Sequence, residues 1–527
     1  MMLRKFVLFA ILIVLGVNAS AATYYVSSGI GTDTNTSAQA QSKTTPWAHA
    51  PGMGGCASNC ASYTPVAGDQ FIFRGGDTWT IAAQWNWTWS GSSGSHIYIG
   101  VDQTWYTGGS WARPILTGGG TFPGASTANF LQIASGSPSY VTVDNLEWTG
   151  FNWTVSVFEG FIGIGGSSNG LLFENNYFHG WTHGSAAENN GEAVVICEGA
   201  GTLNNTFYRN VVDGSDTAEN SFMGIQGSCV GDVSQNEFSQ LMYGFNGDCK
   251  FIRDNVFNSV GFPSYDGASH NGVMLSNVDS SSSCLFYNNV VRGNAITIAL
   301  SVQITPVLGT TSYAFNNVQP DMSAGNGAGL ECGEFFSSDQ SGGTCTWFNN
   351  TLECGPDSNP ATYCYRIGTG LSGTVPAAIY EYNNHIIGNG TITAVSPECA
   401  SACPVTTVTQ ITQSKATANG QGYTLAQTYS FSPTVGGSTI AAGTNESSIC
   451  TAIGAIDATA GTACLSDTTY GVSYNATTHT VSWPARTPVA RGSTWDVGAY
   501  QYSSGGGGSS PGAPSAGMLL SAQIREP

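Results

Sequence analysis

One short segment of the chain holds its densest group of reactive side chains: GFPSYDGASHNG, residues 261–272. It contains Asp266 and His270, and a carboxylate beside an imidazole can orient the ring or raise its basicity, giving an acid/base pair near neutral pH. Tyr265 and Asn271 add a phenol and an amide, which are groups that bind sugar hydroxyls. The structural alternative is an Asx turn at Asp266 and a His270 that only caps the following strand.

Hydrolysis of a glycosidic bond needs a second carboxylate, about 5–5.5 Å away for a retaining reaction and roughly 6.5–9.5 Å away for an inverting one. Two other loops supply Glu192 and Glu219. If these loops stack on adjacent rungs ~4.8 Å apart, their acids can meet such separations. The alternatives are solvated loop acids, or calcium ligands that hold neighbouring loops together. No metal-binding residue can be assigned from the sequence.

Aromatic residues form a second constellation. Four of them each stand two residues before a repeated asparagine: Tyr287, Phe315, Phe348 and Tyr382. If this row faces outward, it is a platform for the apolar faces of sugar rings; the alternative is an aromatic stack covered by residues 400–490, because large exposed patches are unusual. Three tryptophans alternate at strand spacing and share one face, as a capping core or a binding strip: Trp85, Trp87 and Trp89.

The elements that position these side chains follow from eight asparagines, each of which closes an apolar or aromatic run. They are Asn176, Asn210, Asn236, Asn255, Asn289, Asn317, Asn350 and Asn384. Intervals of 19 to 34 residues are typical of parallel β-helix rungs with loops of variable length. Stacked amides would hydrogen-bond into a ladder at a buried turn. We therefore predict an all-β fold, a single-stranded right-handed parallel β-helix (solenoid) with an N-terminal cap and a C-terminal β region.

Each rung carries a second short strand, as in residues 192–199, 222–228 and 271–277. The longest loops come directly before these strands, at residues 182–190, 214–221 and 261–270. Consecutive loops of one kind stack along one side of a solenoid, so that side is the natural place for a binding groove.

The ends of the chain differ in composition from this core. Residues 1–21 have the pattern of an export signal peptide, with Arg4 and Lys5 before an apolar stretch and a small-residue cleavage site. The rest divides into an N-terminal cap, the parallel β-helix, a C-terminal β region that closes the helix, and a Gly/Ser-rich linker with a short tail. The expected bounds are 22–64, 65–395, 396–502 and 503–527.

Charge and cysteine content indicate the compartment. The chain has 33 Asp and Glu against 14 Lys and Arg, a formal net charge of −19, which argues against nucleic acid and anionic membranes as partners. No segment after the signal approaches 18 uninterrupted apolar residues, so no membrane span is expected. Fourteen cysteines fit an oxidising compartment, with local pairs at Cys56–Cys60, Cys399–Cys403 and Cys450–Cys464. We expect a secreted, extracellular monomer.

Three segments together with the asparagine rungs resemble the secreted bacterial right-handed parallel β-helix proteins of the pectate-lyase-like superfamily. They are YYVSSGIGTDTNTS (24–37), AGDQFIFRGGDTW (67–79) and DVGAYQY (496–502). The resemblance implies this fold over about residues 23–502 and a polysaccharide as partner. It does not choose an activity, since the superfamily houses lyases, hydrolases, epimerases and non-catalytic proteins. The Asn-Thr-Asp, Asp-Asp, Gly-His-Gly and Arg-Ile-Lys motifs of its polygalacturonases are absent.

Lyases of the alginate and chondroitin class use a Lys/Arg base pair, and residues 173–199 resemble their rung but carry no lysine. A lyase would have to recruit Lys250 and Arg253, whereas the structural alternative pairs Arg253 with Asp254 or Asp248. We therefore favour a glycoside hydrolase over a polysaccharide lyase, exported and acting on a neutral or weakly acidic polysaccharide. The rival class is a non-catalytic glycan-binding adhesin or surface-structural β-helix protein.

Overall fold

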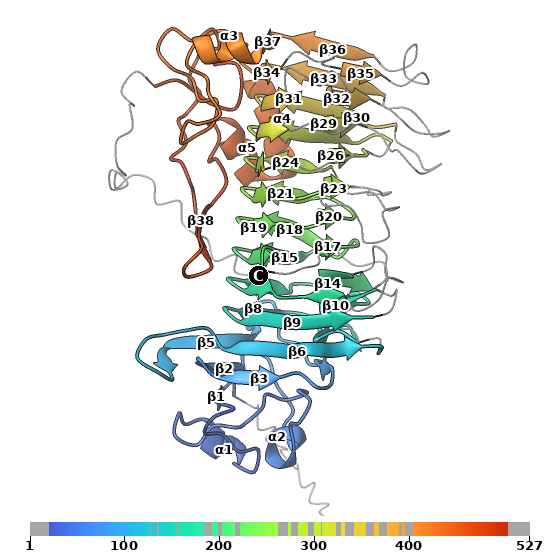
Figure 1. The fold of residues 1–527 in the computed structure, drawn as a ribbon. Helices are drawn as coiled ribbons and strands as arrows, with labels where there is room; N and C mark the ends of the chain where they lie inside the picture. The colour runs from blue at the N-terminus through green and yellow to red at the C-terminus, as the bar shows by residue number, and fades with distance from the viewer. Residues whose placement is uncertain are drawn as a thin grey trace, which may run out of the picture.

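The structure is a computed structural model. It describes residues 20–503, apart from residues 127, 134–135, 155–157, 184–191, 199–202, 217–221, 262–271, 276–282, 294–299, 307, 323–327, 333–341, 355–362, 368–376, 389–392 and 396–403. Three parallel sheets, named A, B and C here, run along the molecule, and each rung passes through them in that order (Figure 1). The prediction of an all-β parallel β-helix is confirmed.

The strands of each sheet follow one another along the solenoid axis. Sheet A contains β1 (Thr23–Val26), β2 (Gln70–Gly75), β5 (Ile97–Tyr106), β8 (Val141–Asp144), β11 (Leu172–Glu174), β15 (Asn205–Tyr208), β18 (Val230–Ser234), β21 (Phe251–Arg253), β24 (Leu285–Tyr287), β27 (Thr311–Phe315), β30 (Thr344–Phe348), β33 (Ala378–Tyr382) and β36 (Val405–Val408). Sheet B contains β3 (Thr78–Thr80), β6 (Ile115–Gly124), β9 (Glu147–Trp153), β12 (Tyr177–His179), β16 (Val211–Asp213), β19 (Glu237–Ser239), β22 (Val256–Asn258), β25 (Val290–Arg292), β28 (Val318–Met322), β31 (Thr351–Cys354), β34 (His385–Ile387) and β37 (Ile411–Gln413), and β13 (Thr182–His183) pairs with β9.

Sheet C is formed by the second strand set that the sequence predicts. It contains β4 (Trp85–Asn86), β7 (Leu131–Ile133), β10 (Glu159–Gly165), β14 (Glu192–Glu198), β17 (Met223–Gln226), β20 (Tyr243–Asn246), β23 (Gly272–Leu275), β26 (Leu300–Ile304), β29 (Ala328–Cys332), β32 (Tyr363–Ile367) and β35 (Thr393–Val395). The long loops enter this sheet, so their positions bear directly on the site.

The corner between sheets A and B is built by the asparagine ladder. All eight side chains are fully buried, and each preceding residue has a left-handed backbone with φ between 51° and 58°. At this corner Asn210 donates its backbone N–H to Asn236 Oδ1 at 2.8 Å, and Asn236 donates to Asn255 Oδ1 at 2.9 Å. The same bond joins every consecutive pair from Asn176 to Asn384. The scaffold role assigned to these residues is confirmed.

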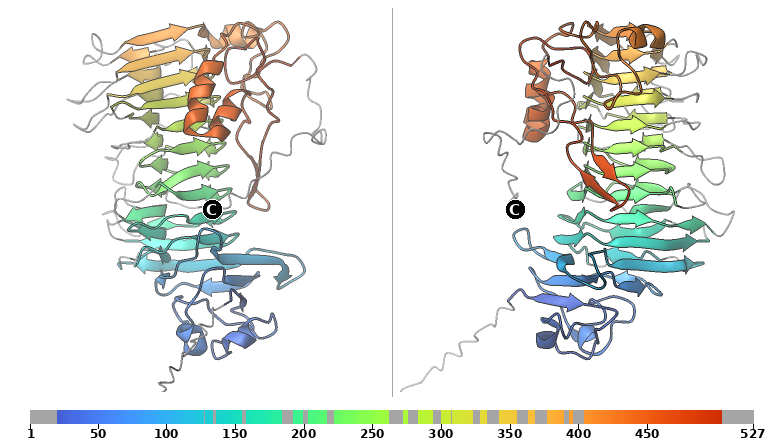
Figure 2. Two further views of the ribbon diagram at one scale, coloured as in Figure 1. Left: turned by 180° about the vertical axis from the view of Figure 1, so that it is seen from behind. Right: turned by 60° about the vertical axis from the view of Figure 1, so that its left-hand side comes forward.

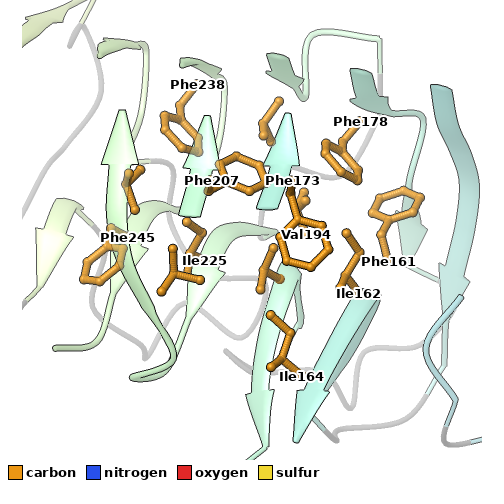
Figure 3. Close-up of a cluster of buried hydrophobic side chains, with 14 of the residues drawn as sticks. Phe161, Ile162, Ile164, Phe173, Phe178, Val194, Phe207, Ile225, Phe238 and Phe245 are labelled. Atoms are coloured by element: carbon orange, nitrogen blue, oxygen red, sulfur yellow. The ribbon is translucent and has the colours of Figure 1, made fainter. Parts of the chain in front are cut away.

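The interior of the solenoid is a continuous apolar core. Phenylalanines of consecutive rungs stack with ring centroids 5.2 to 6.5 Å apart, in the order Phe178, Phe207, Phe238, Phe257 and Phe286. Figure 3 shows the first three of these rings pointing into the core together with Ile162, Ile164 and Ile225 from sheet C. Such quasi-repeats bury one core jointly, so stability is spread along the axis.

A cap closes the N-terminal end of the solenoid. It contains α1 (Ser37–Ala40) and α2 (Ser58–Ser62), and β1 already pairs with β2 of sheet A. Trp85 and Trp87 are fully buried, and Trp89 packs against the same core. Of the two alternatives for these tryptophans, the structure has the capping core. The cap is further fixed by the Cys56–Cys60 disulfide.

The chain after β37 turns back along the outside of the solenoid (Figure 2). This C-terminal region contains α3 (Lys415–Gly420), α4 (Ser447–Ile456), α5 (Ala458–Cys464) and the antiparallel hairpin of β38 (Ser473–Asn475) and β39 (Thr480–Ser482). Helices and loops therefore dominate where the sequence predicts a β region. The rungs themselves extend to β36 and β37, beyond the expected boundary at residue 395.

Among the described residues, six disulfides link parts of the chain: Cys56–Cys60, Cys197–Cys229, Cys249–Cys284, Cys332–Cys345, Cys354–Cys364 and Cys450–Cys464. Two of the three predicted local pairs are among them, and the pair Cys399–Cys403 lies outside the described residues. In the part of the chain that the structure describes, no helix is long and apolar enough to cross a membrane.

Candidate functional site

The loop that carries four of the predicted site residues leads into sheet C. Gly272, which directly follows this loop, donates its backbone N–H to Met242 O at 3.1 Å and begins β23, next to β20. Five of the predicted residues lie outside the described residues: Tyr265, Asp266, His270, Asn271 and Glu219. The entry of the loop into sheet C agrees with the side of the solenoid on which the sequence places a groove.

Glu192, the remaining predicted catalytic residue, is the first residue of β14. Its register partner on the preceding rung is Glu159, the first residue of β10. Both side chains are buried, with exposed fractions of 0% and 1%. Neighbouring strands lie ~4.8 Å apart, so the backbone positions that carry the two carboxyl groups are adjacent.

Glu159 is not among the residues predicted from the sequence, because no long, polar loop precedes it. Two segments indicate the equivalence of Glu159 and Glu192 when they are aligned: FEGFIGIG (158–165) and GEAVVICE (191–198). In both, a glutamate opens a buried strand of the second set. Aligning the strands of consecutive rungs, rather than their loops, would have paired the two glutamates.

The environment of Glu159 favours its protonated form. Burial raises the pKa of its carboxyl to about 7, although a backbone N–H from Ala128, 3.1 Å from Oε2, opposes the shift. The other oxygen, Oε1, is buried and has no hydrogen-bond partner among the described residues. A carboxyl group with a pKa near neutrality can donate a proton as a general acid.

A network of amides and a carboxylate lies next to this pair. Asn129 accepts the Gly160 N–H at 2.7 Å and donates to Gln132 Oε1 at 2.6 Å and to Glu198 Oε1 at 2.9 Å. Gln132 donates in turn to Glu198 Oε2 at 2.9 Å. A Cβ at Gly163 would lie 2.3 Å from Asn129 Nδ2, so glycine leaves the room that this network needs. Amides and an exposed carboxylate are suitable partners for sugar hydroxyls.

The aromatic row is covered by the C-terminal region. Tyr287, Phe315 and Phe348 are at most 1% exposed and stack at 4.8 and 5.1 Å under a cover that includes Ile453 of α4 and Trp495. Tyr382 is half-buried and packs against the same cluster. These rings therefore do not form an exposed platform for sugars. They form the covered aromatic stack that was the alternative prediction from the sequence. The aromatic row faces outward from sheet A, and apolar residues of α4 and α5 cover that face.

Lys250 and Arg253, the residues that a lyase would have to recruit, lie on sheet A and not on sheet C. Arg253 forms ion pairs with Asp232 at 3.0 Å and Asp254 at 3.3 Å, so its predicted partner Asp254 is confirmed. The Lys250 ammonium lies 5.2 Å from the centre of the Phe251 ring. Their geometry is that of an ion-pair cluster beside a surface groove.

A second in-register carboxyl pair, Asp144 and Glu174, also lies on sheet A. Asp144 accepts hydrogen bonds from Tyr98 at 2.6 Å and from Asn175 at 2.8 Å, so both of its oxygens are engaged. Burial, with the charge of Asp144, raises the pKa of Glu174 to about 7. Glu159 differs in retaining one carboxyl oxygen without a partner among the described residues, which makes its pair the stronger candidate.

Over the described ranges, His, Cys, Asp and Glu side chains do not gather in threes in a way that could hold a metal ion. Calcium stays an expectation drawn from the loop acids.

Comparison with known proteins concerns mainly the architecture. No protein-family model matches the chain, and no curated protein matches it either. The solved structures it resembles include the pectate lyase Pel9A (14% identity, TM-score 0.41, covering 92% of this chain and 98% of that chain). Others are a PL6 family polysaccharide lyase from Pseudopedobacter saltans (14%, 0.39, 66% and 89%) and a GH136 lacto-N-biosidase from Eubacterium ramulus (11%, 0.34, 74% and 68%). At such identities and TM-scores, these likenesses assign no activity to the chain.

Proposed function

We propose that this protein is an exported glycoside hydrolase that cleaves a neutral or weakly acidic polysaccharide on the face of sheet C, with Glu159 and Glu192 as its two carboxyl groups. The observation that carries the proposal is their direct register partnership across β10 and β14, combined with the pKa of about 7 at Glu159. Glu159 is then available as the acid, and the proposal assigns the carboxylate role to Glu192, which completes the pair that glycoside hydrolysis requires.

The chemistry follows from this division. Protonated Glu159 donates its proton to the glycosidic oxygen as the bond to the anomeric carbon breaks. Glu192, in the role of the carboxylate, forms an ester bond to that carbon, because strands ~4.8 Å apart favour the shorter carboxyl separation of a retaining enzyme. Water then attacks the anomeric carbon, Glu159 takes up its proton, and Glu192 leaves as the carboxylate.

The loop with Asp266 and His270 belongs to the same proposal at a different position. It enters sheet C at β23, three strands beyond β14, or roughly 14 Å along the axis. We propose that the side chains of this loop, including Tyr265 and Asn271, bind the same polysaccharide at a sugar unit away from the cleaved bond. Glu219 precedes β17 in the sequence, and β17 lies between β14 and β23 in sheet C, so the proposal assigns Glu219 to the binding of the same polysaccharide.

The test is product formation by the protein from residue 22 onward on a panel of polysaccharides. New reducing ends indicate hydrolysis, unsaturated ends absorbing in the ultraviolet indicate a lyase, and binding without products favours the adhesin. Glu159→Gln and Glu192→Gln should each lower turnover at least ~100-fold. The matched control is Glu381→Gln, since Glu381 is also buried with a pKa of about 7 but lies on sheet A at β33.

Asp266→Asn and His270→Ala separate the two candidate centres. If Glu159 and Glu192 carry the reaction, the loop variants should raise KM and leave kcat largely intact. A loss of kcat of ~100-fold in the loop variants, with Glu159→Gln active, would move the acid/base pair to Asp266 and His270. Lost activity with lost thermal stability would instead support the Asx turn at Asp266.

A further inference from the structure

Sheet A has a second surface that the proposed reaction does not use. Helices α4 and α5 cover the outer face of this sheet from β24 onward. On the other half, two hollows of about 680 and 620 Å³ lie over the strands from β1 to β21. Figure 2 shows the C-terminal region beside the upper rungs. Asp457 and Thr459, at the N-terminal end of α5, line the larger hollow.

The larger hollow is elongated along the solenoid axis. Its lining runs from Ser93 before β5 to Arg253 of β21, with Thr206 of β15 between them and Asp457 at the end near α5. The lining residues precede or belong to six successive strands of sheet A, so the groove runs for roughly 24 Å. A groove of that length and shape accommodates several units of an extended linear polymer.

Two tyrosines are held flat against this face by glycines. A Cβ at Gly170 would lie 2.5 Å from Tyr140 Cδ1, and a Cβ at Gly100 would lie 2.5 Å from the Tyr98 ring. Glycine at these two places is therefore what lets each ring lie against the backbone. Both tyrosines are half-buried, so part of each ring is open to a ligand. Rings in this position suit stacking against the apolar faces of sugars.

Tyr140 occupies its place at a conformational cost. Its φ is 58°, a left-handed backbone that bulky residues rarely adopt, whereas Gly170 has a similar φ of 65° without penalty. The cost of such a conformation is on the order of 1–3 kcal/mol and persists where the surroundings or function require it. The ring also packs against His96 at 5.6 Å, and His96 Nδ1 lies 3.1 Å from the Thr142 hydroxyl.

The charge in the groove identifies the class of ligand. Two cations, Lys250 and Arg253, are balanced by two carboxylates, Asp232 and Asp457, and Arg253 is already paired with Asp232. Burial lowers the pKa of His96 and so favours its neutral form. A charge-balanced groove within a chain of net charge −19 gives a polyanion no advantage.

We propose that this groove is a second carbohydrate site, which binds a neutral oligosaccharide in extended form, stacked on Tyr140 and hydrogen-bonded by Lys250, Asn169 and Asn204. The four residues line one continuous hollow on sheet A. The site lies on a different face of the solenoid from Glu159 and Glu192 on sheet C. It therefore holds a stretch of polysaccharide without cleaving it, and it stands independently of the proposed hydrolysis.

The test is isothermal titration of the Glu192→Gln protein with neutral gluco-, xylo- and manno-oligosaccharides and with oligogalacturonate. We expect two binding events with a neutral series. Tyr140→Ala should remove one of them or weaken it roughly tenfold, as lost stacking implies. Lys250→Met should weaken the same event, which keeps the test valid if the tyrosine variant fails to fold. Tyr106→Ala is the control, because Tyr106 is half-buried outside the groove.

The outcomes separate this site from the catalytic proposal. If sheet C binds no glycan, the titration should show one binding event, at the groove on sheet A, and Tyr140→Ala should still remove or weaken it. Unchanged binding in both groove variants would overturn the second site, and preferential binding of oligogalacturonate would overturn the neutral ligand. Cleavage that is lost in Glu174→Gln and kept in Glu159→Gln would move the reaction from sheet C to sheet A, and would overturn the assignment of sheet A to binding alone.

Discussion

Glu159 and Glu192 stand side by side as the first residues of neighbouring parallel strands, and both side chains are buried. In a parallel β-helix, register partners come from positions that are a whole rung apart in the chain, here 33 residues. The fold therefore brings together two acids that no local motif would connect. The burial of Glu159 opposes its ionisation and raises the pKa of its carboxyl to about 7.

Activity should fall on the alkaline side with a midpoint near pH 7. Glu159 acts in its protonated form in the proposed reaction, and raising the pH through its pKa of about 7 removes that proton. The measurement is kcat/KM against pH for the wild type and for Glu159→Gln. The variant should lose the alkaline limb along with most of its turnover, and a variant that kept the limb would assign it to another group.

The His179 cluster on sheet B gives a pH dependence of stability. Burial acts to lower the pKa of His179, but hydrogen bonds and charges from Asp216 at 2.6 Å and Glu147 at 3.1 Å outweigh it and raise the pKa to about 9. The neighbouring ring of His479 reaches this cluster by stacking on Tyr177, whose ring also stacks on His179.

A raised folded-state pKa means that the folded protein binds this proton more tightly than the unfolded chain. The stability from His179 is therefore fully present below pH 6.5 and is lost as the pH rises through about 9. We expect the melting temperature of the wild type to drop more between pH 6 and pH 10 than that of His179→Gln. Equal drops would show that the imidazole is not charged in the fold.

The fold could be predicted from the sequence because its signals repeat. Asn236 is one of eight asparagines in the same setting, and one ladder of hydrogen bonds accounts for all of them. The aromatic row was also found, since Phe315 and its equivalents keep a fixed distance from the ladder. What covers that row was left open, because α4 and α5 are far away in sequence and have no repeat to align.

The candidate site was harder to predict because its members are defined by register. Glu192 was found from its position after a long loop, whereas Glu159 follows a short connection and resembles an ordinary strand residue. Its partnership depends on which residue of one rung faces which residue of the next. Loop lengths that vary between rungs conceal that register in the sequence.

Phe315→Ala should destabilise the protein without changing its activity. The ring is fully buried between Tyr287 and Phe348 and beneath the C-terminal region, so truncation leaves a cavity that costs about 3–5 kcal/mol. The cost should be seen in denaturant unfolding followed by circular dichroism, with kcat/KM unchanged in native conditions. A loss of substrate affinity without a loss of stability would instead support the prediction that this aromatic row binds sugars.

Asn236→Ala should be among the most destabilising single substitutions at the corner between sheets A and B. Its Oδ1 accepts the backbone N–H and the Nδ2 of Asn210, and its own Nδ2 donates to Phe207 O and to Asn255 Oδ1. Removing the amide leaves the buried N–H of Asn210 without a partner, and such an orphan costs about 1–3 kcal/mol. The left-handed turn at Gln235, with φ 58°, loses its anchor as well.

The matched control is Asn246→Ala, because Asn246 is a half-buried asparagine of sheet C, outside the ladder, whose side chain donates to Gln226 Oε1 at 3.0 Å. We expect its unfolding free energy to change by less than half as much as that of Asn236→Ala. Since the ladder is continuous from Asn176 to Asn384, the loss at Asn236 should also raise amide hydrogen exchange in both neighbouring rungs. Equal destabilisation by the two variants would mean that the ladder adds nothing beyond ordinary side-chain hydrogen bonds.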